Sequence, residues 1–114
     1  MTPYISGWKD VADMLTDFEA PEALVGAQLL FARYFAWSYE GGAFVLFERE
    51  GKLFEVNGSH CSCHGLEGQW KPEETSREAL RHRMFNEAGE FRLDSTYEDY
   101  RDEDRAALTK LLSQ

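Results

Sequence analysis

The spacing of apolar residues near the start of the chain predicts a helix. Between Gly7 and Phe18 the apolar side chains recur at steps of three and four residues, which places them on one stripe of a helix. Ser6 stands where an N-cap residue is expected, and Pro21 marks the end of the segment. We therefore expect a helix from about Gly7 to Phe18.

Three segments in the middle of the chain have the pattern of strands. Gln28–Ser38 alternates between two apolar faces, Ala43–Arg49 is rich in aromatic and β-branched residues, and Lys52–Asn57 follows closely. Turns are expected at Glu40-Gly41-Gly42 and at the tight hairpin signal Glu50-Gly51. Short turns between consecutive strands predict an antiparallel meander, and apolar groups on both faces indicate that helices cover the second face.

The first of these strands contains one exception to its apolar pattern. Simple alternation places Leu29 and Phe31 on one face and Leu30 and Ala32 on the other. Arg33 falls on the face of Leu29 and Phe31, and it is the only charged residue of that face.

Two further helices are expected after residue 70. Thr75-Ser76-Arg77-Glu78 has the form of a capping box and predicts a helix from about Ser76 to Phe85. The last helix should span about Asp102 to Leu112, with acidic residues at its N-terminus, where the helix dipole favours them. The expected fold is therefore one α+β domain over residues 1–114, a three-stranded antiparallel meander flanked by one N-terminal and two C-terminal helices.

Composition favours a folded protein of the cytoplasm. The chain has 114 residues, of which 43% are hydrophobic, enough for a core without staples. No apolar run approaches the roughly 20 residues of a membrane helix, and the N-terminus lacks the pattern of a secretory signal. We therefore expect no membrane association and reduced cysteines.

The charge of the chain is strongly acidic and unevenly distributed. The net charge is −9, which disfavours direct binding to nucleic acid and suits a basic partner. Residues 1–70 carry ten acidic residues against four basic ones, and residues 71–114 carry eleven against eight. Arg77, Arg81, His82 and Arg83 form a local basic patch in the second part.

The segment Asn57–Gly65 holds the residues best suited to chemistry. His60, Cys61, Cys63 and His64 are four candidate zinc ligands within five residues. Side chains at adjacent positions diverge, and structural zinc sites usually draw on two separated pairs. We therefore favour no metal and no cofactor, and we expect the cysteines to pack as small apolar groups while the histidines cap a compact turn.

Catalysis by a cysteine is the second chemical alternative for this segment. It needs a thiolate, a base and an orienting group, and Cys63, His82 and either Glu78 or Asp94 could supply them. The spacing is Cys-x-Cys rather than Cys-x-x-Cys, and the sequence has neither a papain-like nor a thioredoxin-like signature. We therefore expect the protein not to be an enzyme.

The acidic run near the C-terminus is the candidate surface for a partner. Carboxylates alternate there with two tyrosines, and aromatic side chains often dominate the energy of an interface. A solvated start of a helix is the alternative interpretation. Asp10, Asp13, Asp17 and Glu19 could extend this surface or form a second one. The candidate partner-binding residues are Asp94, Tyr97, Glu98, Asp99, Tyr100, Asp102, Glu103 and Asp104.

The middle of the chain carries a resemblance to a group of proteins. The segments Gly42–Phe47 and Gly51–Glu67, with Gln69-Trp70 and Pro72-Glu73-Glu74 after them, resemble small uncharacterised proteins encoded by bacteriophages and prophages. The resemblance assigns a role to no residue. It implies a setting, because short acidic phage proteins are often inhibitors that occupy the nucleic-acid site of a host protein.

These observations together favour a non-enzymatic acidic binding protein. Its expected form is a phage-encoded inhibitor of the anti-CRISPR or anti-restriction type, which acts in the host cytoplasm on a basic, nucleic-acid-binding complex. The alternatives are a small metal- or thiol-dependent protein that uses His60-Cys61-Ser62-Cys63-His64, and an assembly subunit. The sequence leaves the identity of the partner and the oligomeric state open.

Overall fold

A five-stranded mixed sheet forms the centre of the protein. The computed structural model describes residues 2–37, 40–61, 65–92 and 100–113. The strands lie in the order β1-β2-β3-β4-β5. They are β1 (Tyr4–Ser6), β2 (Gln28–Trp37), β3 (Glu40–Arg49), β4 (Lys52–His60) and β5 (Glu73–Thr75), and the helices are α1 (Val11–Phe18), α2 (Arg77–Met84) and α3 (Asp102–Leu112).

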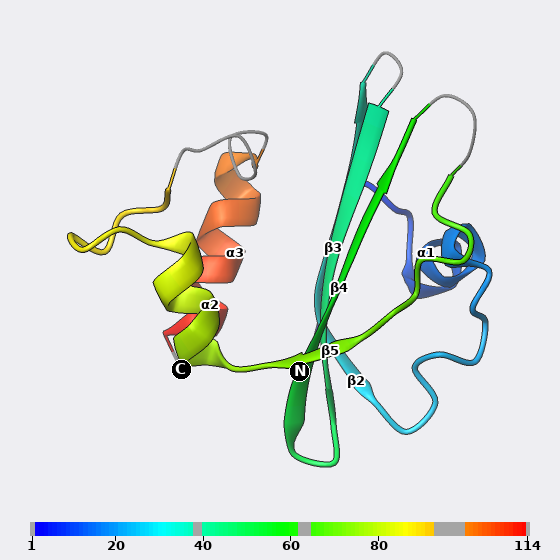
Figure 1. Cartoon of the computed structure of the whole chain (residues 1–114), viewed down its shortest axis with the longest axis horizontal. Helices are drawn as coiled ribbons and strands as arrows, with labels where there is room; N and C mark the ends of the chain where they lie inside the picture. The colour runs from blue at the N-terminus through cyan, green and yellow to red at the C-terminus, as the bar shows by residue number, and fades with distance from the viewer. Residues whose placement is uncertain (1, 38–39, 62–64, 93–99, 114) are drawn as a thin grey trace.

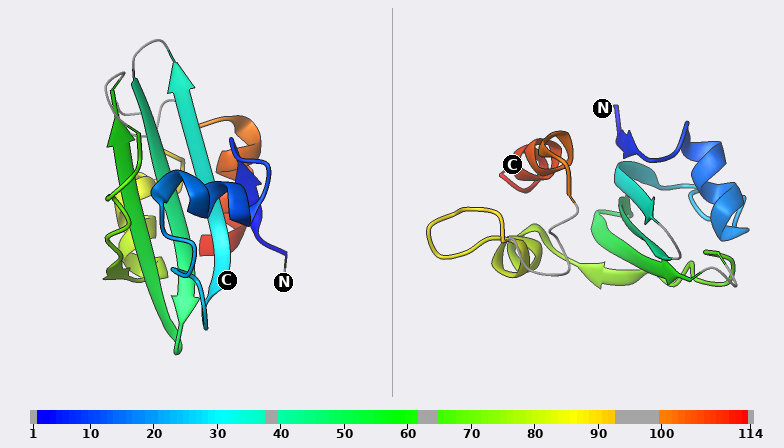
Figure 2. Two further views of the ribbon diagram at one scale, coloured as in Figure 1. Left: turned by 90° about the vertical axis from the view of Figure 1, so that its right-hand side faces the viewer. Right: turned by 90° about the horizontal axis from the view of Figure 1, so that it is seen from above.

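Helices lie on both faces of this sheet. Figure 1 shows α1 on one side and α2 with α3 on the other, and the view from above in Figure 2 shows the same three layers. One buried cluster joins Phe18 of α1 to the β3 residue Phe47, and the other joins Leu80 and Leu108 of α2 and α3 to Leu46. The alternation of β3 therefore supplies two cores, because successive residues point to opposite faces. No helix among the described residues is long and apolar enough to cross a membrane.

The predicted three-stranded antiparallel meander, flanked by one N-terminal and two C-terminal helices, is wrong as a fold. Two short strands enlarge the sheet: β1 pairs in parallel with β2, and β5 pairs antiparallel with β4. Each has three residues, too few to show an alternating pattern in the sequence. Tyr4 pairs with Phe31, and Thr75 pairs with Leu53. Both pairings are therefore tertiary contacts that local propensity does not indicate.

The first helix begins later than its hydrophobic pattern indicates. Ser6 belongs to β1 and pairs with Arg33, so it cannot cap a helix at Gly7. Gly7 has a φ of +87° and lies so close to the backbone of Tyr34 that a Cβ atom would overlap it, which keeps this part of the chain on β2. The N-cap is Asp10, whose carboxylate accepts a hydrogen bond from the Asp13 amide at 2.9 Å.

A bulge in β2 changes which residues face each core. The register of β2 against β3 shifts between Leu29 and Phe31, and the extra residue is Leu30. Leu30 and Phe31 therefore both belong to the core under α2 and α3, whereas Leu29 belongs to the core under α1. Simple alternation had placed Leu29 with Phe31, and the bulge is the physical reason why that prediction is wrong.

The strands β3 and β4 are longer at one end than expected. Gly41 and Gly42, expected in a turn, lie in β3 and pair with His60 and Ser59 of β4. The segment from Asn57 to His60 is therefore part of a strand and not part of a compact turn. At the other end the Glu50-Gly51 turn has positive φ angles of 54° and 77°, as a two-residue hairpin loop requires.

Candidate functional site

The arginine that interrupts the apolar pattern of β2 is buried in the structure. Arg33 is 3% exposed, and its guanidinium carbon lies 4.5 Å from the centroid of the Phe35 ring and 4.0 Å from that of Tyr100. Arg33 and Arg101 both line a cavity of about 430 Å³ between the sheet and the start of α3. A charge at such a depth requires a partner, because removing an ion from water costs several kcal/mol.

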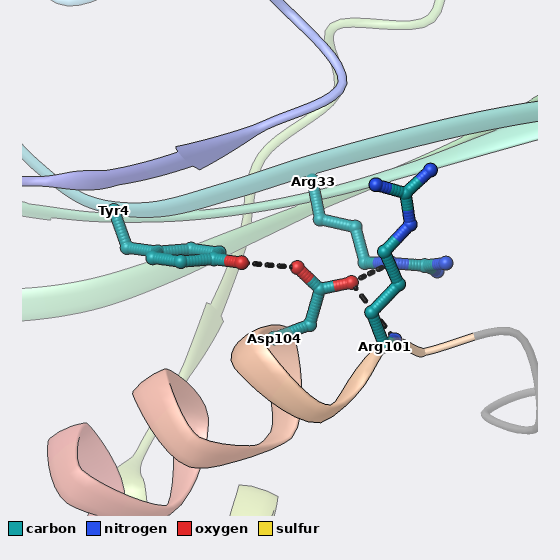
Figure 3. A network of polar contacts seen from close by, with 4 residues as sticks. All are labelled: Tyr4, Arg33, Arg101 and Asp104. Atoms are coloured by element: carbon teal, nitrogen blue, oxygen red, sulfur yellow. Dashed lines mark hydrogen bonds and ion pairs between the residues drawn. The ribbon is translucent and has the colours of Figure 1, made fainter.

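Asp104, in the first turn of α3, is a partner of Arg33. The Arg33 Nε donates to Asp104 Oδ2 at 3.0 Å, and the two side chains are 4% and 1% exposed. The hydroxyl of Tyr4 donates to Asp104 Oδ1 at 2.5 Å, and the backbone amide of Arg101 donates to Oδ2 at 3.1 Å (Figure 3). One carboxylate therefore joins β1, β2 and the N-terminus of α3.

The hydrogen bonds of this network determine its protonation. Burial raises the pKa of Asp104, whereas hydrogen bonds from Tyr4, from the Arg101 amide and from Arg33 lower it. The hydrogen bonds outweigh burial, so the pKa is below the ordinary value of 3.8. Burial, together with the hydrogen bond to the Asp104 carboxylate, raises the pKa of Tyr4 to about 12. Asp104 is therefore an anion at neutral pH, and Tyr4 keeps the proton that it donates.

This network divides the acidic run that the sequence marks as a partner surface. Tyr100 is 5% and Asp104 1% exposed, so neither side chain belongs to the surface of the folded protein. The helical period explains this, because Asp104 shares the sheet-facing side of α3 with Leu108 and Leu111. Asp102 and Glu103 are exposed. Asp94, Tyr97, Glu98 and Asp99 lie outside the described residues.

His60, expected to cap a turn, is instead held within the sheet. Its ring stacks on that of Tyr34, and its Nε2 lies 2.7 Å from the Tyr34 hydroxyl. Its Nδ1 lies 3.2 Å from the carbonyl oxygen of Cys61. A carbonyl oxygen can only accept, so Nδ1 carries the hydrogen, and in the neutral ring Nε2 accepts from Tyr34. Gly41 leaves room for the ring, because a Cβ atom there would overlap His60 Nε2.

This geometry limits the chemistry of the candidate metal and thiol segment. Both nitrogens of His60 have partners, so a metal ion could bind only by displacing the Tyr34 hydroxyl or the Cys61 carbonyl. Burial raises the pKa of Tyr34, as does the nearby carboxylate of Asp17, so the hydroxyl keeps its proton. Ser62, Cys63 and His64 lie outside the described residues. Within the described ranges, His, Cys, Asp and Glu side chains form no group of three or more that could hold a metal ion.

The basic patch of α2 stabilises other elements. Arg77 Nε donates to the Leu111 carbonyl at 3.3 Å, and Arg81 donates to the Leu112 carbonyl. Both contacts satisfy carbonyl groups at the C-terminus of α3, where positive charge is favourable. His82 is exposed, and Glu78, considered as the orienting group of a cysteine nucleophile, is an exposed residue of the same helix.

Arg83 forms an ion pair with a carboxylate of β4. Its Nη2 donates to Glu55 Oε1 at 2.7 Å, and the side-chain Nδ2 of Asn57 donates to the same oxygen at 2.8 Å. Burial raises the pKa of Glu55, but hydrogen bonds from Arg83, Asn57 and Thr75 outweigh it and leave the pKa below its ordinary value. Glu55 is therefore charged at neutral pH although it is only 5% exposed.

One group of acidic residues lies on the opposite side of the sheet, on and around α1. Between residues 9 and 22 there are five carboxylates and one basic residue, Lys9. Glu67 belongs to the same region, because it lines a cavity together with Asp17, Tyr34 and His60. Figure 2 (left) shows this side of the molecule facing the viewer. We call it the α1 acidic face, and it consists of Asp10, Asp13, Asp17, Glu19, Glu22 and Glu67.

An apolar side chain projects beside this face. The side chain belongs to Val25, which is 75% exposed; among the described residues, no other large hydrophobic side chain is exposed. Its turn is held by Arg49, whose Nη2 donates to the Ala23 carbonyl at 2.6 Å and to the Val25 carbonyl at 3.3 Å. The amide of Val25 also donates to the Glu22 carbonyl at 3.2 Å. Val25 is therefore presented to solvent by an ordered turn.

Comparisons of the chain with protein-family models, with curated proteins and with solved structures find no match.

Proposed function

We propose that this protein is a non-enzymatic binding protein that docks its α1 acidic face into a basic site of a partner. The observation that carries the proposal is the segregation of charge between the two faces of the sheet. Between residues 9 and 22 five carboxylates face one basic residue, whereas the side of α2 and α3 carries the three arginines of α2 together with exposed carboxylates such as Glu78, Asp102 and Glu103. A surface of one sign steers an oppositely charged partner during association and fixes its orientation.

The hydrogen bonds of the α1 acidic face support this proposal. The carboxylate of Asp13 accepts from the Lys9 amide at 2.9 Å, and that of Asp17 accepts from the indole nitrogen of Trp8 at 2.6 Å. These bonds hold the charges in place before binding, which reduces the entropy lost on association. Val25 adds an apolar contact at the edge of the face, and the partner therefore needs basic residues beside a small apolar depression.

The more specific form of the proposal concerns biological setting. The resemblance to phage-encoded proteins and the acidity of the chain favour an inhibitor that acts in the host cytoplasm. It would cover the nucleic-acid-binding site of a defence complex, as an anti-CRISPR or anti-restriction protein does. Such an inhibitor mimics the charge of a phosphate backbone, so it needs neither a metal nor a reactive cysteine and does not itself bind nucleic acid.

A charge-reversal experiment tests this proposal. Glu19 and Glu22 are exposed. Neither side chain forms a hydrogen bond with a described residue, so both can be replaced without loss of such a contact. Proteins captured from a host lysate by the wild type are identified and purified, and association rates are then measured with Glu19→Lys combined with Glu22→Lys. At low salt we expect the rate to fall by about tenfold or more, and we expect DNA or RNA to compete with the wild type for the partner.

Two further double variants serve as controls. Glu87→Lys with Glu90→Lys makes the same change of charge on the loop after α2 and should leave the rate nearly unchanged. Asp102→Lys with Glu103→Lys tests the exposed part of the acidic run on α3. The proposal fails if no nucleic-acid-binding protein is captured, if nucleic acid does not compete, or if the α1 variant binds as fast as the wild type.

A further inference from the structure

A further cavity lies on the side of the sheet that α2 and α3 cover. It has a volume of about 530 Å³ and lies between α2, the loop of residues 86–92 and the C-terminus of α3. Four of its side chains, Glu78, Arg81, His82 and Phe85, come from α2 at steps of three and four residues, which places them on one stripe of the helix and its C-cap. This groove belongs neither to the α1 acidic face nor to the Arg33 network.

The loop that closes the groove is ordered by its own hydrogen bonds. The side-chain oxygen of Asn86 accepts from the amides of Ala88 and Glu90, both at 2.9 Å. The Arg92 amide donates to the Met84 carbonyl at 2.8 Å. The rings of Phe85 and Phe91 pack edge to face at 5.6 Å. The groove is therefore formed before any ligand binds, which lowers the cost of binding.

Two guanidinium groups of the groove have donors to spare. Arg81 donates one hydrogen bond to the Leu112 carbonyl, and Arg92 donates one through Nε to the Phe85 carbonyl at 3.1 Å. A guanidinium group carries five N–H donors, and no other hydrogen bond links either group to a described residue. Each arginine is thus anchored at one nitrogen, and its remaining donors can serve an anion in the groove.

The rest of the lining selects among anions. Phe85 and Leu112 supply apolar surface, and Glu78 and Glu87 place two carboxylates around the same groove. These two carboxylates repel a doubly charged phosphate more strongly than a singly charged anion. A singly charged carboxylate is the better match, because a planar guanidinium group pairs with both of its oxygens.

We propose that this groove binds a carboxylate carried on an apolar body, with Arg81 and Arg92 holding the carboxylate and Phe85 and Leu112 contacting the apolar part. A free organic acid and the C-terminus of a peptide share this chemistry. The site is independent of the proposed function, because it lies on the face opposite to α1 (Figure 2, right).

Titration of the full chain with phenylacetate, followed by NMR, tests the proposal. We expect saturable shifts of Phe85, Leu112 and Arg92 signals, with a dissociation constant on the order of 1 mM. Phenylacetamide has the same shape without the charge and should bind about tenfold more weakly or worse, as should Arg92→Gln and Arg81→Gln with phenylacetate. Lys52→Gln removes a positive charge at an exposed position and should bind like the wild type.

Two further experiments test the proposal even if the glutamine variants lose the local fold. Arg92→Lys retains the charge and loses the planar fork, so phenylacetate should still bind, but more weakly. A short peptide ending in phenylalanine is compared with its C-terminal amide, and tighter binding than phenylacetate identifies a peptide as the source of the carboxylate. Equal binding of phenylacetate and phenylacetamide, tighter binding of inorganic phosphate, or no saturable shift would each overturn the proposal.

Discussion

The contact between Asp104 and Arg33 allows a sharp test of what holds the two halves of the fold together. Asp104→Asn keeps the shape of the side chain and removes its charge. Arg33 would then be a cation that is 3% exposed without its carboxylate. Removing one partner of a buried ion pair costs about 3 to 5 kcal/mol, a large part of the roughly 5 to 15 kcal/mol that stabilise a typical domain.

Urea unfolding, followed by circular dichroism at neutral pH, measures this loss. Asp102→Asn is the matched control, because it makes the same change in the same turn of α3 at an exposed position. There only the interaction with the helix dipole is lost, about 0.3 to 1 kcal/mol. Arg33→Met combined with Asp104→Leu removes both charges and should be more stable than Asp104→Asn, because neither member of the ion pair then remains without the other.

The difference in free energy of unfolding between wild type and Asp104→Asn should also depend on pH, which gives a second test. The pKa of Asp104 is lower in the folded protein than its ordinary value of 3.8, so the unfolded chain binds this proton more readily. The stability that Asp104 contributes is therefore complete above about pH 4 and is lost as the pH falls through the lower pKa of the folded state. A loss below about 1 kcal/mol for Asp104→Asn, or a double variant less stable than Asp104→Asn, would refute the reasoning.

Three further predictions concern other contacts. Gly41→Ala should displace the His60 ring and cost about 1 to 3 kcal/mol, and unchanged NMR shifts of His60 would contradict the steric argument. Tyr4→Phe should reduce the loss of stability at high pH. The pKa of Tyr4 is raised from 10.0 to about 12, so the stability that its hydroxyl contributes is present below pH 10 and is lost as the pH rises through 12. If the free energy of unfolding in urea falls equally steeply with pH in wild type and variant, this prediction is wrong. Gln69→Ala should speed amide exchange at Ser59, because the Gln69 amide group accepts from the Ser59 amide at 2.8 Å and donates to its carbonyl at 2.7 Å; an unchanged exchange rate would show that this contact does not protect the edge of β4.

Local patterns predict the long elements better than the pairings between them. The periodicity of β2, β3 and β4 is visible because each has nine or ten residues, enough for alternation to be recognised. The edge strands β1 and β5 have three residues each and depend on partners distant in sequence. The cap of α2 is intermediate. Ser76 does cap the helix, and its side chain accepts a hydrogen bond from the Ala79 amide. A capping box needs a glutamate three residues after the cap, and that position is Ala79 rather than Glu78.

Arg33 shows how far a single anomalous residue can be interpreted. A charge in an otherwise apolar strand signals a buried pair, because an isolated buried ion is too costly to persist. The sequence does not indicate which acid is the partner, since Asp104 is 71 residues away and is one of eleven acidic residues after position 70. The same limit applies to His60 and Tyr34, which meet only because β4 and β2 both flank β3.

The acidic run shows why a stretch of like charges is not yet a surface. Asp102, Glu103 and Asp104 are consecutive, but the helix turns by about 100° per residue, so they cannot all face the same way. Two of them are exposed and the third is buried against the sheet. On α1, Asp13 and Asp17 are four residues apart and therefore lie on one side of the helix. The spacing of charges along a helix, rather than their number, is therefore the reason for proposing α1 rather than α3 as a partner surface.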